Sequence, residues 1–271
     1  MPELPEVETT RRGLLPHVVG QRIRDVVVRN PNLRWPVPRD LRRHLRGERV
    51  DDIRRRGKYL LFDTRHGQLL VHLGMSGKLS LVPEGEPARR HDHIDLQLED
   101  HRALRLTDPR RFGAMLWLAD GAKTHALLAG LGLEPLDAEF TGEAMRALAK
   151  GRRVAIKQFL MNGRMVTGVG NIYASEALFA ARVHPQRPAG SLSLARWNRL
   201  VAAIRETLER ALEWGGTTLR DFAAADGNPG HFQHHFAVYG REGKPCPRCG
   251  TKIRAIRQGQ RSTFYCPKCQ R

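Results

Sequence analysis

The pattern of apolar and polar positions divides the chain into a strand-rich first half and a helical second half. Short apolar or alternating runs separated by turn residues are typical of β-strands. Such runs occupy Ile23–Val28, Tyr59–Asp63, Gln68–Leu73, His93–Leu98, Ala103–Leu106 and Ala114–Leu118. Residues 5–15 predict a short helix that stops near Gly13 and Pro16. The first half is therefore expected to be β-rich, with a sandwich or barrel as the favoured architecture.

From about residue 136 the apolar positions follow a helical period. Ser193 stands where an N-cap is expected, and Gly215 and Gly216 provide a stop. The predicted apolar face of the helix between them consists of Leu194, Trp197, Leu200, Val201, Ile204, Leu208 and Leu212. A shorter helix is predicted over 172–182.

Together these patterns predict an α+β protein with three domains. We expect a β-sandwich at 1–135, a helical domain at 136–225 and a small cysteine-bearing module at 236–271. No apolar run approaches the roughly 20 residues that span a bilayer. The first residues also lack the basic and apolar stretches of a signal peptide. We therefore expect a soluble, cytoplasmic protein.

The charge balance favours an anionic polymer as the partner. Lys and Arg number 46 against 28 Asp and Glu, which gives a net charge of +18 and a pI of about 10.9. A field of this size attracts nucleic acid. The alternatives are a merely soluble basic surface or an anionic membrane, but no long basic amphipathic helix supports the membrane.

All four cysteines lie close to the end of the chain, in two CxxC pairs. Cys246 and Cys249 form one pair, Cys266 and Cys269 the other, and 16 residues separate them. This spacing is typical of a zinc ribbon in which four thiolates surround one structural ion. Two disulfides are the alternative, although a cytosolic chain keeps its thiols reduced. Residues 241–271 also carry nine Lys or Arg and one acid, so the ribbon is expected to contact phosphates.

The opening MPELPEVETT places acids beside the chain terminus of a basic protein. If Met1 is removed, Pro2 presents a secondary amine with a pKa near 7.7–8.0, so a useful fraction is neutral at pH 7. Such an amine attacks an aldehyde-like carbon and forms an iminium ion, and Glu3 could then transfer protons. The alternative is an ordinary helix start, which also favours acids.

The chain resembles bacterial formamidopyrimidine-DNA glycosylases from residue 2 to Cys269. The resemblance rests on MPELPEVET, RRRGKYLL, HLGMSGKL, LTDPRRFGA, GVGNIYASEAL and the four-cysteine ribbon, in this order. It implies an enzyme of base excision repair that removes oxidised purines, chiefly 8-oxoguanine and formamidopyrimidines. It further implies that the enzyme then cuts the strand at the abasic site by β,δ-elimination.

The resemblance also assigns the catalytic residues. It implies that Pro2 is the nucleophile on the sugar C1′, that Glu3 is the acid and that Glu6 supports them. Lys58 matches the proton donor for β-elimination, although a solvated lysine at a strand end would look the same. Arg261 matches the ribbon arginine linked to δ-elimination. A guanidinium grips phosphate well but donates protons poorly, which favours a positioning role for it.

Further residues match those that hold DNA. An enzyme that acts on a base must flip it out of the duplex. Met75, Arg110 and Phe112 match the side chains that fill the gap, where Met and Phe replace stacking and Arg binds the orphaned cytosine. Without the resemblance, Met75 and Phe112 would be assigned to the core. His91 and Arg152 match phosphate contacts.

The segment LMNGRMVTGVGNIYASEAL resembles a helix–two-turn–helix. Its Gly168 and Gly170 permit tight turns that bring Asn171 and backbone amides to a phosphate. Lys157 and Tyr173 flank the same site. The resemblance places two more side chains at the lesion pocket, namely Glu176 and Arg220, and some relatives carry lysine at the second position.

Three other functions compete with this one. They are an endonuclease VIII-like glycosylase for oxidised pyrimidines, a non-catalytic protein that binds damaged DNA, and a ribosome-associated zinc-ribbon protein. The first lacks the LTDPRRFG motif, the second has no need of Pro2, Glu3 and Lys58 together, and the third leaves the N-terminus unexplained. We expect a monomer that binds double-stranded DNA and associates with the bacterial nucleoid.

Overall fold

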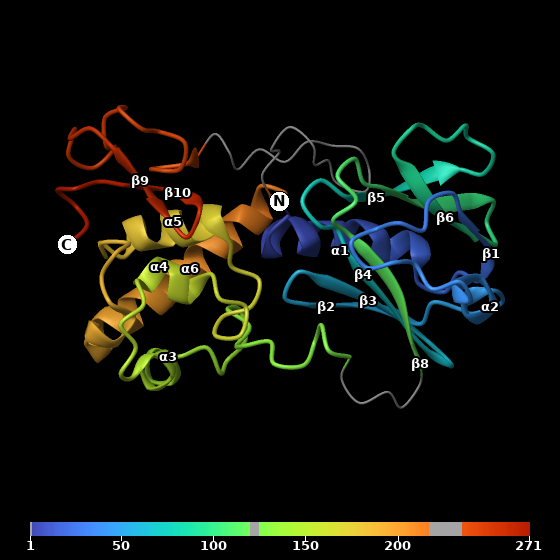
Figure 1. The fold of residues 1–271 in the computed structure, drawn as a ribbon, viewed down its shortest axis with the longest axis horizontal. Helices are drawn as coiled ribbons and strands as arrows, with labels where there is room; N and C mark the ends of the chain where they lie inside the picture. The colour runs from blue at the N-terminus through green and yellow to red at the C-terminus, as the bar shows by residue number, and fades with distance from the viewer. Residues whose placement is uncertain (1, 120–124, 217–234) are drawn as a thin grey trace. The chain divides into compact units, whose positions relative to one another are not determined.

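A computed structural model describes residues 2–119, 125–216 and 235–271, which form two compact units (Figure 1). The first unit holds the described residues up to 129 together with 214–216, and the second holds 130–213 and 235–271. The helical segment and the cysteine module thus share the second unit. No helix in the described ranges is long and apolar enough to cross a membrane.

The first unit contains two antiparallel four-stranded sheets, with the strand orders β1-β6-β7-β5 and β2-β3-β4-β8. The strands are β1 (Ile23–Val28), β2 (Asp52–Arg56), β3 (Tyr59–Thr64), β4 (Gly67–His72), β5 (Lys78–Pro83), β6 (Asp92–Leu98), β7 (Arg102–Thr107) and β8 (Ala114–Ala119). Side chains of both sheets, such as Leu96 and Leu104 from one and Phe62 and Leu69 from the other, meet in one buried cluster. The predicted β-sandwich is confirmed.

Two strands, β2 and β5, were not predicted, because each buries a single side chain. A strand with one buried residue gives a weaker hydrophobic signal than a strand that is buried along most of its length. Strand β2 buries only Ile53, and it is held by backbone pairing with β3 from Asp52↔Asp63 to Arg56↔Tyr59. The short helix α2 (Leu41–Leu45) was not predicted either.

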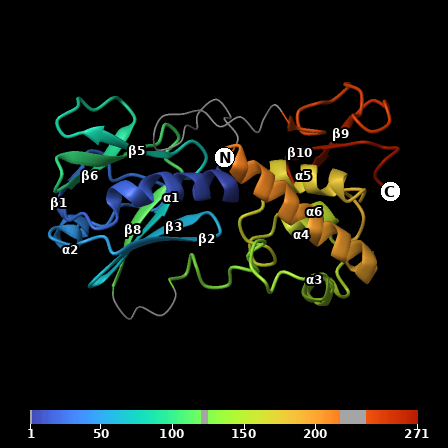
Figure 2. The ribbon, with the colours of Figure 1, turned by 180° about the vertical axis from the view of Figure 1, so that it is seen from behind.

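Helix α1 (Leu4–Val18) packs on β2 and β3 (Figure 2). It continues past the predicted stop and contains Pro16 in its last turn. A proline there removes one hydrogen bond near the helix end, and the burial of Leu14 and Val18 in the core offsets that loss.

The second unit contains the helices α3 (Gly142–Ala149), α4 (Ile156–Leu160), α5 (Asn171–Ala180) and α6 (Leu194–Glu213), the 3-10 turn η1 (Ala189–Ser191), and the hairpin strands β9 (Arg254–Gln258) and β10 (Arg261–Tyr265). Helix α5 contacts both α6 and β10. The predicted N-cap of α6 is confirmed, because Ser193 Oγ accepts the backbone N–H of Arg196 at 3.4 Å. Its predicted apolar face is buried at Trp197 and Leu208, while the end residue Leu212 is half-buried.

Candidate functional site

The N-terminal residues are packed into the first unit. Pro2 is buried, and Glu3 and Glu6 are each only 2% exposed. Glu3 is the N-cap of α1 and forms a capping box with Glu6, whose Oε2 accepts the backbone N–H of Glu3 at 2.8 Å. Pro2, whose nitrogen is the predicted nucleophile, therefore precedes a residue whose backbone N–H is held by a hydrogen bond. A preorganised site requires such a fixed backbone. Met1 lies outside the described residues.

Lys58 occupies the turn between β2 and β3, next to a partly buried ionic network. The Glu8 carboxylate accepts hydrogen bonds from Arg11 at 2.8 Å and from Arg55 at 3.2 Å. Arg55 also donates to the carbonyl of Gly57 at 3.0 Å, one residue before Lys58. The network thus links α1, which begins two residues after the predicted nucleophile, to the turn that carries Lys58. Local pattern cannot reveal it, since Glu8 and Arg55 are 47 residues apart.

His72, at the end of β4, is held in its neutral form. Its ring packs against Tyr59 at 4.8 Å between centroids, and its Nδ1 accepts the N–H of Gly74 at 3.1 Å. Burial, together with the smaller effect of the positive charges of Lys58 and Arg34, lowers the pKa of His72 to about 4. A neutral ring keeps Nδ1 available to the loop that follows β4.

This pKa predicts a loss of stability in acid. In the unfolded chain His72 becomes protonated below a pH of about 6.5. In the folded chain His72 stays neutral until the pH falls to about 4. The contribution is thus complete above pH 6.5 and is lost as the pH falls towards 4, by at most about 3 kcal/mol. Urea unfolding at pH 7.5 and 4.5 should show a smaller acid loss for His72→Asn than for the native protein. Equal losses would contradict the assignment, and the exposed His17→Asn serves as control.

Two neighbouring loops of the first unit present apolar side chains to solvent. Met75, between β4 and β5, is 36% exposed, and Phe112, between β7 and β8, is 38% exposed. Neither is a core residue. The guanidinium of Arg110 lies 4.9 Å from the centre of the Phe112 ring. A hollow of about 470 Å³ adjoins them, lined by Asn32, Leu33, Arg34, Arg110, Arg111 and Phe112. His91 lies before β6, where its carbonyl accepts the N–H of Asp108 at 2.9 Å.

In the second unit, the predicted turn geometry is found before α5. Gly168 has a φ of +82°, which favours glycine, and Gly170 is the extended N-cap of the helix. Asn171 follows as the first residue of α5. Arg152 is exposed and donates through Nε to the carbonyl of Leu148 at 2.8 Å.

Lys157 is a buried link between α4 and β10 and not an open cation. It is 1% exposed, and its Nζ lies 2.6 Å from Asn171 Oδ1, 2.7 Å from Thr263 Oγ1 and 3.2 Å from the carbonyl of Ser262. The ammonium thus joins the start of α5 to the hairpin. The predicted role of Lys157 beside a DNA phosphate stays a prediction, and the described structure shows Nζ bonded to protein oxygens.

Replacement of Lys157 by methionine is expected to destabilise the second unit by about 3 kcal/mol, because buried oxygens lose their charged donor. Urea unfolding should measure this loss, with the exposed Lys150→Met as the matched control. A Lys157→Met protein as stable as the control would show that these hydrogen bonds contribute little.

Two more predicted site residues of α5, Tyr173 and Glu176, are buried in the described structure. Tyr173 is 1% exposed and packs in the core. The Glu176 carboxylate accepts backbone N–H groups from Ala237, Val238 and Tyr239 at 2.8, 3.0 and 2.8 Å. Burial raises the pKa of Glu176, and these three hydrogen bonds oppose that rise. In the described structure Glu176 thus anchors the segment leading into the cysteine module. Arg220 lies outside the described residues.

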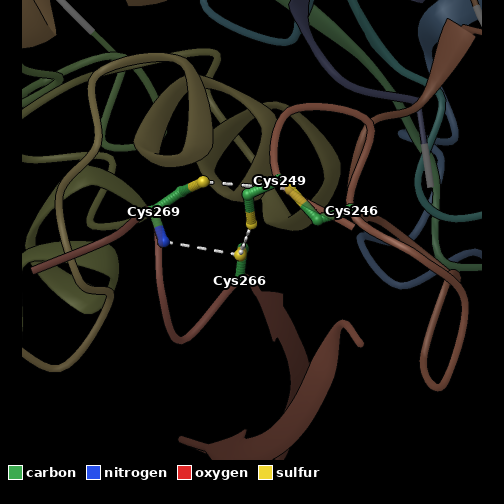
Figure 3. Close-up of side chains that lie close together, drawn as sticks. All are labelled: Cys246, Cys249, Cys266 and Cys269. Carbon is green, nitrogen blue, oxygen red and sulfur yellow. Dashed lines mark hydrogen bonds between the residues drawn. The ribbon is translucent and has the colours of Figure 1, made fainter. Parts of the chain in front are cut away.

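The cysteine geometry fits one tetrahedral ion. All four cysteines are described, none is in a disulfide, and their Sγ atoms lie within 4.8 Å of one another (Figure 3). The Sγ separations are 3.9 Å for Cys246 and Cys269 and 3.5 Å for Cys249 and Cys266. Zinc–sulfur bonds of about 2.3 Å in a tetrahedron place sulfurs about 3.8 Å apart. The four thiolates can therefore hold zinc, which would fix the start of the module to the end of β10.

The basic side chains of the module follow the hairpin. Arg254 and Arg257 lie on β9, and Arg261 begins β10 opposite Gln258. Arg254, Arg257 and Arg261 are all exposed. A zinc-held hairpin thus presents guanidinium groups to solvent, as a phosphate-binding surface requires.

Comparisons with known proteins cover the whole chain. Family models match in order: the formamidopyrimidine-DNA glycosylase N-terminal domain over 1–115, the H2TH domain of the same enzyme over 131–223, and the zinc finger found in FPG and IleRS over 243–271. The formamidopyrimidine-DNA glycosylase of Methylococcus capsulatus is 57% identical over 271 residues, which is 100% of both chains.

Solved structures agree with the sequence matches. A Lactococcus lactis Fpg mutant in complex with Fapy-dG-containing DNA has a TM-score of 0.93 and 34% identity, with 100% of each chain covered. The same organism's Fpg in complex with abasic-site DNA has a TM-score of 0.92 and 34% identity, with 99% of each chain covered. On these matches, the chain belongs to the formamidopyrimidine-DNA glycosylase family.

Proposed function

We propose that the protein excises oxidised purines from duplex DNA and then cleaves the abasic strand. The observation that carries this proposal is the buried Pro2–Glu3 start of α1 in a chain that matches a named formamidopyrimidine-DNA glycosylase over its full length. The two Lactococcus complexes add that close structural neighbours hold a damaged purine or an abasic site.

The chemistry begins at the terminal amine. The Pro2 nitrogen attacks C1′, the bond from C1′ to the base breaks, and the departing base takes up a proton. Glu3 protonates the ring oxygen as the sugar opens, which leaves an iminium ion between Pro2 and C1′. This ion withdraws electrons, so the C2′ proton is lost and the 3′ phosphate departs. Lys58 acts as the proton donor in this β-elimination. The 5′ phosphate leaves in the δ-elimination that follows.

The exposed loop residues of the first unit would replace the flipped nucleotide. Phe112 and Met75 are exposed apolar groups that can enter a base stack, and Arg110 already lies against the Phe112 ring. We assign the adjoining hollow, with its three arginines, to the strand opposite the lesion. His91 would bind a backbone phosphate from the same unit.

The second unit would grip the backbone. The N-terminus of α5 offers amides for a phosphate, next to Asn171, and Arg152 and Arg261 are exposed cations. Arg261 would position the phosphates during δ-elimination. Lys157, Tyr173 and Glu176 would support this surface from within, and Arg220 would contact the lesion. One structural zinc ion, a monomeric state and a cytoplasmic location on the bacterial nucleoid complete the proposal.

Strand cleavage tests the proposal. Labelled duplexes that carry 8-oxoguanine opposite cytosine, an oxidised pyrimidine or an abasic site are incubated with the protein, beside an undamaged duplex. Cleavage at 8-oxoguanine and at the abasic site is expected. Preference for the pyrimidine would favour the endonuclease VIII-like activity, and tight binding without cleavage would favour a non-catalytic binder.

A further inference from the structure

The loops that carry Met75, Arg110 and Phe112 are tied together by a buried carboxylate. Asp108 is 0% exposed and stands just before Arg110, at the end of β7. Its Oδ1 accepts the hydroxyl of Ser76 at 3.1 Å, and its Oδ2 accepts the backbone N–H of Gly113 at 2.8 Å. Ser76 follows Met75 directly, and Gly113 follows Phe112 directly. One carboxylate therefore binds the residue after each exposed apolar side chain.

Further hydrogen bonds complete the link. Ser76 Oγ accepts the N–H of Arg110 at 3.3 Å, so the serine both donates to Asp108 and receives from the second loop. The carbonyl of Asp108 accepts the N–H of Arg111 at 3.1 Å and Nε2–H of His93 at 2.9 Å. The backbone on either side of Arg110 is thus held in place.

The backbones of the two loops also interlock. A Cβ on Gly74, whose φ is +62°, would stand 2.4 Å from the carbonyl carbon of Phe112. Arg111 has a φ of +56°, a left-handed conformation that costs a non-glycine residue about 1–3 kcal/mol and persists only where the surroundings impose it. The hydrogen bonds around Asp108 provide that constraint.

From this geometry we propose that Asp108 and Ser76 are a positioning pair that sets Met75, Arg110 and Phe112 for entry into the duplex. The pair would control how fast a damaged nucleotide is extruded, with no contact to the reacting atoms. The inference rests on the proposed function. Aspartate suits this position because Ser76 and Gly113 each donate to one of its two oxygens, whereas asparagine would present an amide N–H₂ to one of these donors.

The test separates extrusion from chemistry. Asp108→Asn and Ser76→Ala are compared with the native protein on a duplex with 8-oxoguanine and on a single strand with an abasic site, where nothing is extruded. Asp25→Asn, which removes an exposed ion pair with Arg42 on the same unit, is the matched control. We expect both variants to excise 8-oxoguanine at least tenfold more slowly under single-turnover conditions and to cut the single strand at the native rate.

A double-mutant cycle and a fluorescent probe complete the design. If the two side chains act as a pair, the double variant should be no slower than Asp108→Asn alone. A 2-aminopurine opposite the lesion reports entry of the loops into the duplex, and its signal should slow in parallel. If Asp108→Asn fails to fold, Ser76→Ala carries the test. Native rates in a folded variant would overturn the proposal. Absence of cleavage by the native protein would instead refute the proposed function, and the fluorescence signal would still report on the pair.

Discussion

Glu3→Gln is expected to abolish covalent trapping of the protein on a duplex that carries 8-oxoguanine. Borohydride reduces the iminium ion formed by Pro2 and so captures the protein on the DNA. Glutamine keeps the size of Glu3 but cannot give up a proton, and loss of a positioned acid costs about 10²–10⁴-fold in rate. The side chain is 2% exposed and caps α1, so water cannot readily take its place.

The trapping experiment needs three comparisons. Intact mass must show native protein without Met1, because a retained methionine turns the Pro2 nitrogen into an amide that cannot form an iminium ion. Pro2→Gly tests the terminal amine itself. Glu48→Gln removes another carboxylate of the first unit, one that binds His66 at 2.6 Å, and should trap normally. Native trapping by Glu3→Gln would exclude Glu3 as the acid, and trapping by a protein that retains Met1 would exclude Pro2 as the nucleophile.

Removal of zinc is expected to unfold the cysteine module and to weaken DNA binding at least 100-fold. Zinc contributes about 10–16 kcal/mol to the folding of zinc-finger peptides. The hairpin it holds presents Arg257 and Arg261, and it also supplies two of the three oxygens that bind Lys157 Nζ. Loss of the metal therefore removes phosphate contacts and disturbs the start of α5, which Lys157 binds through Asn171.

The measurement combines metal analysis with affinity for an abasic duplex. Native protein should contain one zinc per chain, and Cys249→Ser should lose both zinc and affinity. Chelated native protein should recover on addition of zinc, whereas the serine variant should not. Ser262→Ala changes a hairpin side chain without removing a thiolate and is the matched control. Full affinity after complete removal of zinc would contradict the prediction. It would show either that the module folds without zinc or that DNA binding does not need the folded module.

Patterns within short stretches of the chain predicted much of this architecture. The short apolar or alternating runs identified six strands of the sandwich, because each of these strands buries at least two side chains in the core. Strands β2 and β5 were not predicted, since β2 buries only Ile53 and β5 buries only Leu79. The spacing of Cys246, Cys249, Cys266 and Cys269 predicted the metal cluster, because ligands on two tight turns are local in sequence.

The roles of several predicted site residues depended on contacts that no local pattern contains. Lys157 and Glu176 matched DNA-binding or lesion positions, yet the folded chain surrounds one with Asn171 and Thr263 and the other with backbone N–H groups. A lysine or glutamate on an amphipathic segment looks the same whether it faces solvent or a hydrogen-bond partner. Only burial, which depends on distant segments, distinguishes the two cases.

By itself the sequence determined the strand-rich and helical halves, the four-cysteine cluster, the basic charge and the resemblance that predicts catalytic roles for Pro2, Glu3 and Lys58. These depend on residue type and on spacing along a few turns of chain. The tertiary structure alone decided that Met75 and Phe112 are exposed, that Glu8 and Arg55 join α1 to the Lys58 turn, and that Asp108 binds Ser76. The last two pairs are 47 and 32 residues apart, so only chain folding, which brings these polar groups together away from water, places them within hydrogen-bonding distance.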